Sequence, residues 1–110
     1  NIFNSNRFNN HIEKVEIVQG NAIKTIPKYV KQNQHLLISL LYLDFDLFEP
    51  TQVAMKNFIP RMSKGSILAF DQLNQKRWSG ETVAMLKNLN INNFKLRQLE
   101  HEPNISYIKL

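Results

Sequence analysis

The sequence predicts an α/β fold with a mainly parallel β-sheet that ends in an antiparallel hairpin. Segments with the pattern of strands alternate with segments of helical periodicity over residues 15–90, as in sheets whose strands are joined by right-handed helical crossovers. A nearly uninterrupted apolar run, residues 36–43, is typical of a strand covered on both faces. Two further strand-like segments, 94–99 and 105–110, predict the closing hairpin.

The first elements are expected on either side of a turn at Gly20. Residues 15–19 alternate apolar and polar side chains, which predicts a short strand. Asn21 is placed to cap a helix. The apolar face of that helix consists of Ile23, Ile26 and Val30. Because proline is tolerated only in the first turn of a helix, Pro27 leads us to expect that this helix begins late.

A second helix and a second buried strand are expected after the apolar run. Pro50 is suited to be the first helical residue. The apolar stripe that follows consists of Met55, Phe58, Ile59 and Met62. Pro60 and then Lys64–Gly65 are expected to end the helix, and residues 66–70 then form the strand.

A third helix is expected over residues 80–90, after a polar loop that carries the single Trp. Its inward face is expected to consist of Val83, Leu86 and Leu89.

Composition limits the classes of function. The chain has 110 residues, of which 43% are hydrophobic, so it can form one small domain with a core. The net charge of +5 comes from scattered Lys and Arg residues, which favours a solvated basic surface over a nucleic-acid groove. The absence of cysteine excludes disulfides and thiolate metal sites and fits a cytoplasmic protein. No segment is apolar and long enough to span a bilayer, and the three histidines match no metal-ligand spacing.

Acidic side chains follow both predicted buried strands. Asp44 and Asp46 lie at alternate positions after the first, and Asp71 and Gln72 follow the second. Because neighbouring parallel strands lie about 4.8 Å apart and end at the same edge, these side chains can share one hard cation such as Mg²⁺ or Ca²⁺. The alternative is that the acids cap nearby helices or are hydrated.

Four sequence blocks occur in an order that is characteristic of one enzyme family. They are Gly20–Ala22 (GNA), Leu43–Thr51 (LDFDLFEPT), Pro60–Gln72 (PRMSKGSILAFDQ) and Trp78–Thr82 (WSGET). Together they resemble the macrocin/mycinamicin-type sugar O-methyltransferases. The resemblance implies a Rossmann-like class I methyltransferase sheet and an enzyme that uses S-adenosylmethionine and Mg²⁺ to methylate a hydroxyl of a sugar or a similar small molecule or glycan.

The resemblance also implies roles for the acids. Asp44, Asp71 and the position of Gln72 correspond to Mg²⁺ ligands, and Asp46 corresponds to the base that removes the proton of the acceptor hydroxyl. Which of Asp44 and Asp46 holds the metal stays open. Such a division of labour suits the chemistry, because a bound dication lowers the pKa of an alcohol and a nearby carboxylate then removes its proton.

The remaining implied site residues belong to the two flanking blocks. Gly20, Asn21 and Ala22 would meet the cofactor, with the Asn21 amide where the family has an acid that contacts adenine. Trp78 and Glu81 would border the acceptor.

The chain departs from the family's pattern in several places. Gln72 replaces an acid, Ser66 replaces a Gly and Ser79 replaces a Pro. The Gly-rich first strand and the acidic second strand of the family have no counterpart here. We therefore expect one partial methyltransferase domain over 1–110, in which 1–14 form a loop or the tail of a helix. Its uncovered apolar sheet edge would favour a homo-oligomer or a covering polypeptide.

Two other functions remain open. A metal-dependent glycosyltransferase could use the Asp44/Asp46 pair to hold a nucleotide sugar, although it would give Asp71 and Gln72 no evident role. A non-catalytic remnant or interaction module could keep the sheet and lack the cofactor site.

Overall fold

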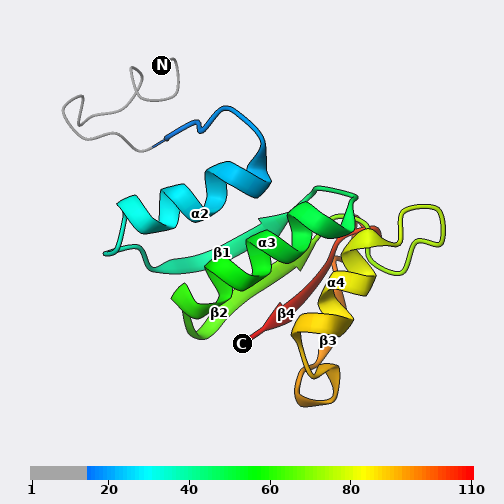
Figure 1. The fold of residues 1–110 in the computed structure, drawn as a ribbon. Helices are drawn as coiled ribbons and strands as arrows, with labels where there is room; N and C mark the ends of the chain where they lie inside the picture. Colours follow the sequence, from blue (N-terminus) through cyan, green and yellow to red (C-terminus); the bar gives the residue numbers. More distant parts are fainter. Residues whose placement is uncertain (1–14) are drawn as a thin grey trace.

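The protein is described by a computed structural model over residues 15–110, and the loop or helix tail predicted for 1–14 lies outside the described residues. The elements, in chain order (Figure 1), are α2 (Ala22–Gln32), β1 (Ile38–Leu43), α3 (Phe48–Phe58), β2 (Met62–Phe70), α4 (Gly80–Asn88), β3 (Leu96–Gln98) and β4 (Ser106–Lys109). Within this part of the chain, every helix is too short or too polar to cross a membrane.

The strands form one mixed sheet in the order β1-β2-β4-β3. β1 pairs with β2 in parallel, whereas β4 is antiparallel to both β2 and β3. Leu43 lies beside Phe70, so β1 and β2 end at the same level. The predicted α/β fold, with parallel strands followed by an antiparallel hairpin, is confirmed.

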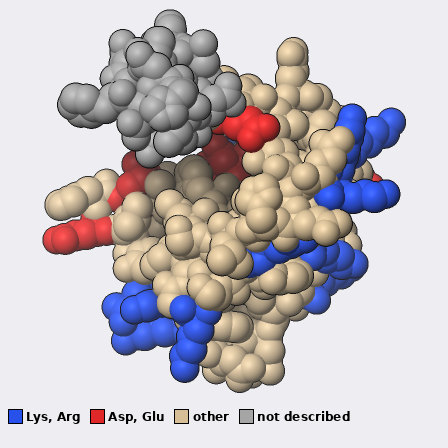
Figure 2. Space-filling view, turned by 90° about the vertical axis from the view of Figure 1, so that its left-hand side faces the viewer, with Lys and Arg blue, Asp and Glu red and all other residues tan. Residues whose placement is uncertain are grey.

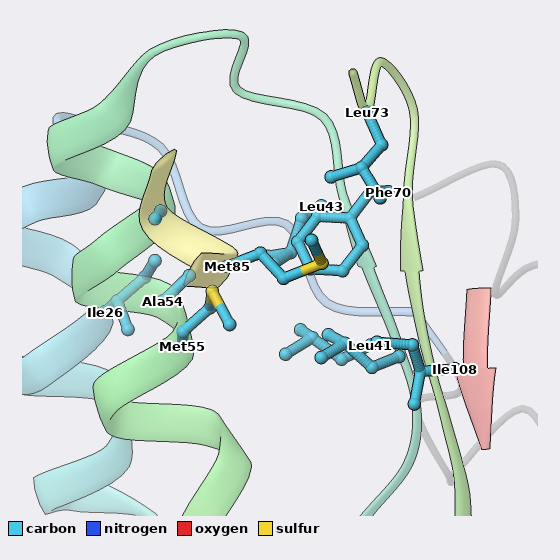
Figure 3. Close-up of a cluster of buried hydrophobic side chains, with 11 residues drawn as sticks. Ile26, Leu41, Leu43, Ala54, Met55, Phe70, Leu73, Met85 and Ile108 are labelled. Atoms are coloured by element: carbon cyan, nitrogen blue, oxygen red, sulfur yellow. The ribbon is translucent and has the colours of Figure 1, made fainter. Parts of the chain in front are cut away.

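The helices α2, α3 and α4 all lie on one face of the sheet (Figures 1 and 3). The core between the two layers contains Leu43, Met55, Leu68, Phe70 and Ile108, each at most 1% exposed. Figure 3 shows Met55 and Met85 pointing from the helices toward the strand residues Leu43 and Phe70. Burial of these side chains fixes the helical layer against the sheet.

The opposite face of the sheet carries no helix from the described residues. Leu40 is 61% exposed and Tyr42 is 46% exposed, and they line a shallow apolar groove together with Ile67 and Tyr107. The apolar run led us to expect a strand covered on both faces, but the described residues cover only one face. The alternation of buried Leu41 and Leu43 with exposed neighbours is that of a strand packed on one side.

The strand expected over residues 15–19 does not form. These residues run beside α2, where the Tyr29 hydroxyl donates a hydrogen bond of 3.0 Å to Glu16 Oε2. Figure 1 places them away from the sheet, and a strand forms only where a neighbour accepts and donates its ladder hydrogen bonds. No described strand supplies that neighbour.

The helix boundaries also differ from the predictions. α2 begins directly after Asn21 and contains Pro27, which removes only its hydrogen bond to the carbonyl of residue 23. α3 begins at Phe48, so Pro50 lies within its first turn and is not its first residue. It ends at Phe58 and is followed by a 3₁₀ turn that contains Pro60, which has no N–H to continue the helical hydrogen bonds. Met62 belongs to β2.

The inward face of α4 differs from the predicted one. Val83 is 39% exposed and Leu86 is 53% exposed, whereas Glu81, Ala84 and Met85 are buried. Leu89 packs against the core, as predicted. Relative to the prediction, α4 is turned about its own axis. Its first residue, Gly80, packs so closely against residues 46–48 that an added Cβ atom would collide with backbone atoms.

We expect Leu43→Ala to lower the free energy of unfolding by about 2–5 kcal/mol, because it opens a cavity in a packed core. Leu40→Ala on the same strand is the matched control, since Leu40 lies on the open face. We expect the control to change stability by less than about 1 kcal/mol in urea denaturation followed by circular dichroism. Equal losses in both variants would contradict the one-sided packing.

Candidate active site

Three carboxylates converge where β1 and β2 end. Asp44, Asp46 and Asp71 each offer one oxygen, and these three atoms lie within 4.8 Å of one another. The parallel register causes this, and a hydrogen bond of 3.0 Å from the Asp71 backbone N–H to the Leu43 carbonyl links the two strand ends. The structure thus brings together the acids that the sequence singled out, at a separation that one cation could span.

Asp46 occupies a sharp turn between β1 and α3. Its φ of 62° is in the left-handed region, which aspartate tolerates better than most side chains. Its backbone N–H donates a hydrogen bond of 3.0 Å to Glu81 Oε2. Asp46 is therefore held in an uncommon backbone conformation by a contact from α4.

Two buried oxygens near this turn have no hydrogen-bond partner among the described residues. They are Asp46 Oδ1 and Gln72 Oε1. Leaving a buried polar atom unpaired costs free energy, so such atoms are expected to meet a ligand, a cation or water. Carboxylate and amide oxygens are also the donor set that Mg²⁺ and Ca²⁺ prefer, so these residues fit a divalent cation.

The pKa of Asp44 is raised by its surroundings. Partial removal from water, a side-chain hydrogen bond with Asp71 and the negative charges of Asp71 and Asp46 all raise the pKa of Asp44. A cation or a shared proton would relieve this repulsion.

Tyr42 is a site residue that the sequence analysis missed. Its hydroxyl donates a hydrogen bond of 2.5 Å to Asp71 Oδ1, and this bond, together with burial and the nearby acids, raises the pKa of Tyr42 to about 12. The sequence feature that could have identified Tyr42 is its position two residues before Asp44, because alternate residues of a strand lie on the same face.

Glu81 and Trp78, both assigned to the acceptor by resemblance, lie in different surroundings. Glu81 has no exposed surface, and its carboxylate accepts hydrogen bonds from the backbone N–H groups of Asp46 and Gln72. Burial raises the pKa of Glu81, although these two hydrogen bonds act in the opposite direction. Trp78 is 44% exposed in the loop before α4. Of the two, Trp78 is the one accessible to a ligand.

The Gly20–Ala22 block lies at the amino end of α2. The side chain of Asn21 caps the helix by accepting a hydrogen bond of 3.1 Å from the Ile23 N–H, which confirms the predicted cap. Gly20 and Ala22 line a cavity of about 400 Å³ that Phe45 and Phe58 also line. Phe45 stands between Asp44 and Asp46 in the chain, but none of the three clustered acids lines this cavity.

The charged side chains are separated on the surface. Figure 2 shows acidic side chains around a hollow in the upper part of one face, with Lys and Arg side chains in separate groups below and to the right. On the described part of this face, the basic residues form no continuous stripe of the kind that tracks a nucleic-acid backbone.

We expect Asn21→Ala to lower stability by about 1 kcal/mol, since it leaves a helical N–H without its cap. Asn21→Asp keeps an oxygen acceptor and is the control, with a change close to zero. Urea denaturation measures both. Equal stability of the Ala and Asp variants would show that the cap does not contribute.

Comparison with known proteins identifies structural relatives. No family model matches the sequence, and no curated protein matches it significantly. An apo structure of CalS11, a TDP-rhamnose 3′-O-methyltransferase and an enzyme in calicheamicin biosynthesis, gives a TM-score of 0.90 at 35% identity over 98% of this chain and 46% of that chain. A second structure of CalS11, described as a calicheamicin methyltransferase, gives 0.90 and 35% over 98% and 42%.

A more distant likeness concerns the fold alone. The O-methyltransferase NovP gives a TM-score of 0.52 at 20% identity over 64% of this chain and 28% of that chain. The chain spans a little under half the length of the CalS11 chains that it matches. By fold and by sequence identity, the chain is similar to a part of CalS11, a sugar O-methyltransferase.

Proposed function

We propose that the protein is an O-methyltransferase that uses S-adenosylmethionine and a divalent cation, Mg²⁺ first, to methylate a hydroxyl of a sugar or a similar molecule. The observation that carries the proposal is the convergence of three carboxylates, with two unpaired buried oxygens on Asp46 and Gln72. The family supplies the reaction, since CalS11 is a TDP-rhamnose 3′-O-methyltransferase.

We assign the cation to Asp44, Asp71 and the amide oxygen of Gln72. Asp44 and Asp71 share a hydrogen bond and repel one another, so a dication between them would replace repulsion with attraction. When bound, the cation supplies Lewis-acid chemistry: it lowers the pKa of the acceptor hydroxyl and orients it. With an amide in place of an acid at position 72, the site has one negative charge fewer for holding a dication.

We assign the proton transfer to Asp46. Its Oδ1 accepts no hydrogen bond from the described residues, so it is free to accept one from the acceptor hydroxyl and then take its proton. The backbone of Asp46 is held by Glu81, which limits how far this carboxylate can move. A carboxylate that is already held in a reactive orientation loses less entropy in the reaction, which lowers the barrier.

We assign the cofactor to the cavity lined by Gly20 and Ala22, and we assign a contact with it to Asn21, which lies between them in the chain. S-adenosylmethionine, when bound, supplies the methyl group. The cavity is lined partly by Phe45 and Tyr29, so aromatic surface is available to a flat ring such as adenine. Trp78, which is 44% exposed in the loop between Asp71 and α4, is assigned to the acceptor.

The acceptor, the cellular location and the oligomeric state of the protein are also proposals. We propose a small-molecule or glycan hydroxyl acceptor, a cytoplasmic location and a homo-oligomer. The open apolar face around Leu40 and Tyr42 supports self-association, because exposed apolar surface of this kind favours a covering partner. Light scattering after size exclusion tests the oligomer.

Calorimetry with S-adenosylhomocysteine and with a nucleotide sugar, each with and without Mg²⁺, separates the candidate functions. The proposal expects S-adenosylhomocysteine to bind. Binding of the nucleotide sugar alone would indicate a glycosyltransferase instead. Binding of neither would indicate a non-catalytic module and would overturn the proposal.

We expect Asp71→Asn to weaken Mg²⁺ or Mn²⁺ binding by more than about 10-fold, since even residues that merely support metal ligands contribute roughly 10- to 100-fold. Glu49→Gln is the control, because Glu49 is an exposed acid outside the cluster. Calorimetric titration at fixed ionic strength measures both. A similar loss in the two variants would indicate a general charge effect and would count against a site at Asp71.

A further inference from the structure

Glu81 joins two loops that follow different strands. Its Oε2 accepts a hydrogen bond of 3.0 Å from the Asp46 N–H, after β1, and its Oε1 accepts one of 3.3 Å from the Gln72 N–H, after β2. The side chain has no exposed surface. One carboxylate on α4 thus links the two loops through a hydrogen bond to each.

The two residues that Glu81 holds are also the two that carry unpaired buried oxygens, Asp46 Oδ1 and Gln72 Oε1. Each of these residues has its backbone fixed and its side-chain oxygen left free for another partner. Burial of a carboxylate is costly, and packing alone gives no reason for an acid at position 81. Its position is explained by what it does to the two loops.

Gly80 supplies a second, independent constraint. A Cβ atom at this position would collide with the backbone of Leu47 and Phe48 and would lie 2.8 Å from the Asp46 carbonyl oxygen. The first turn of α4 therefore sits directly against the turn at Asp46. Together with the positive φ of Asp46, this contact allows little freedom in where the Asp46 side chain points.

We propose that Glu81 is a positioning residue that sets the distance between the Asp46 and Gln72 loops so that their side-chain oxygens face a divalent cation and its bound hydroxyl. Glu81 reaches neither the cation nor the acceptor and acts through the backbone of the two loops. The inference rests on the proposed function, because it concerns the same cation site.

Two substitutions distinguish the effect of the Glu81 hydrogen-bond geometry from the effect of its charge. Glu81→Gln keeps the length of the side chain, but its amide nitrogen would face one of the two backbone donors. Glu81→Asp keeps the charge but is one methylene too short to reach both. We expect both variants to weaken Mn²⁺ binding by roughly 10- to 100-fold, as substitutions of residues that orient metal ligands do.

Thr82→Val is the matched control. Thr82 Oγ1 accepts a hydrogen bond of 2.7 Å from the Asn74 N–H, so this variant also removes a contact from α4 to a loop, but not to Asp46 or Gln72. We expect its Mn²⁺ affinity to stay within about 2-fold of the wild type. Calorimetry on the full chain measures affinity, and circular dichroism gives the folded fraction used to correct it.

The outcomes distinguish this inference from the proposed function. Wild-type chain that binds no Mn²⁺ overturns both. Wild-type binding that persists in Glu81→Gln and Glu81→Asp overturns only the positioning role, and so does normal affinity in Glu81→Asp alone, because charge would then suffice.

Amide hydrogen exchange in the wild type gives a test that needs no variant to fold. We expect the Asp46 and Gln72 amides to exchange more slowly than exposed loop amides. Exchange as fast as in an exposed loop would overturn the proposal.

Discussion

The parallel pairing of β1 with β2 is the constraint on which the rest of the structure depends. With Leu43 beside Phe70, the two strands end at the same level, and Asp44, Asp46 and Asp71 are delivered to one edge. A slip of one residue would move the side chains of β2 to the other face and would separate the acids. The packing of Leu43, Leu68 and Phe70 beneath α3 and α4 opposes such a slip, because a shift by one residue would turn core side chains of β2 toward the open face. Hydrophobic burial on one face of the sheet therefore fixes the strand register that brings the three carboxylates together at the sheet edge.

Three carboxylates this close together repel one another, and the surrounding groups determine how that repulsion is accommodated. Tyr42 donates to Asp71 from the open face, while Glu81 holds the backbone from the core side. Neither contact neutralises the cluster, since a hydroxyl is neutral and Glu81 is itself an acid. Partial removal from water, together with the neighbouring acids, raises the pKa of Asp44. A cluster of carboxylates without a neighbouring cationic side chain among the described residues attracts a cation, which is the property expected of a cation site.

The sequence predicted those features that follow from local pattern and parallel topology. Alternating strands and helices led to the sheet and the hairpin, and acids at strand ends led to the cluster around Asp44. It could not reveal that Glu81 turns inward to two backbone N–H groups, because that depends on the rotation of α4, which Gly80 sets through a contact far away in sequence. Val83 and Leu86 were misplaced for the same reason. The unformed strand at 15–19 and the open face beside Leu40 depend on which segments lie next to them, and periodicity carries no such information.

The two halves of the candidate site are held by contacts of different kinds. The acidic edge is fixed by hydrogen bonds within residues 42–81 and by a packed core beneath it. The cavity beside Gly20 is bounded on one side by α2 and Phe58, but on the other by residues 16–20, which are exposed and pair with no described strand. Phe45 lines the cavity and stands between Asp44 and Asp46 in the chain. Cation affinity therefore depends on the sheet and α4, whereas cofactor affinity also depends on α2 and residues 16–20. A weak cofactor complex would thus be compatible with an intact cation site.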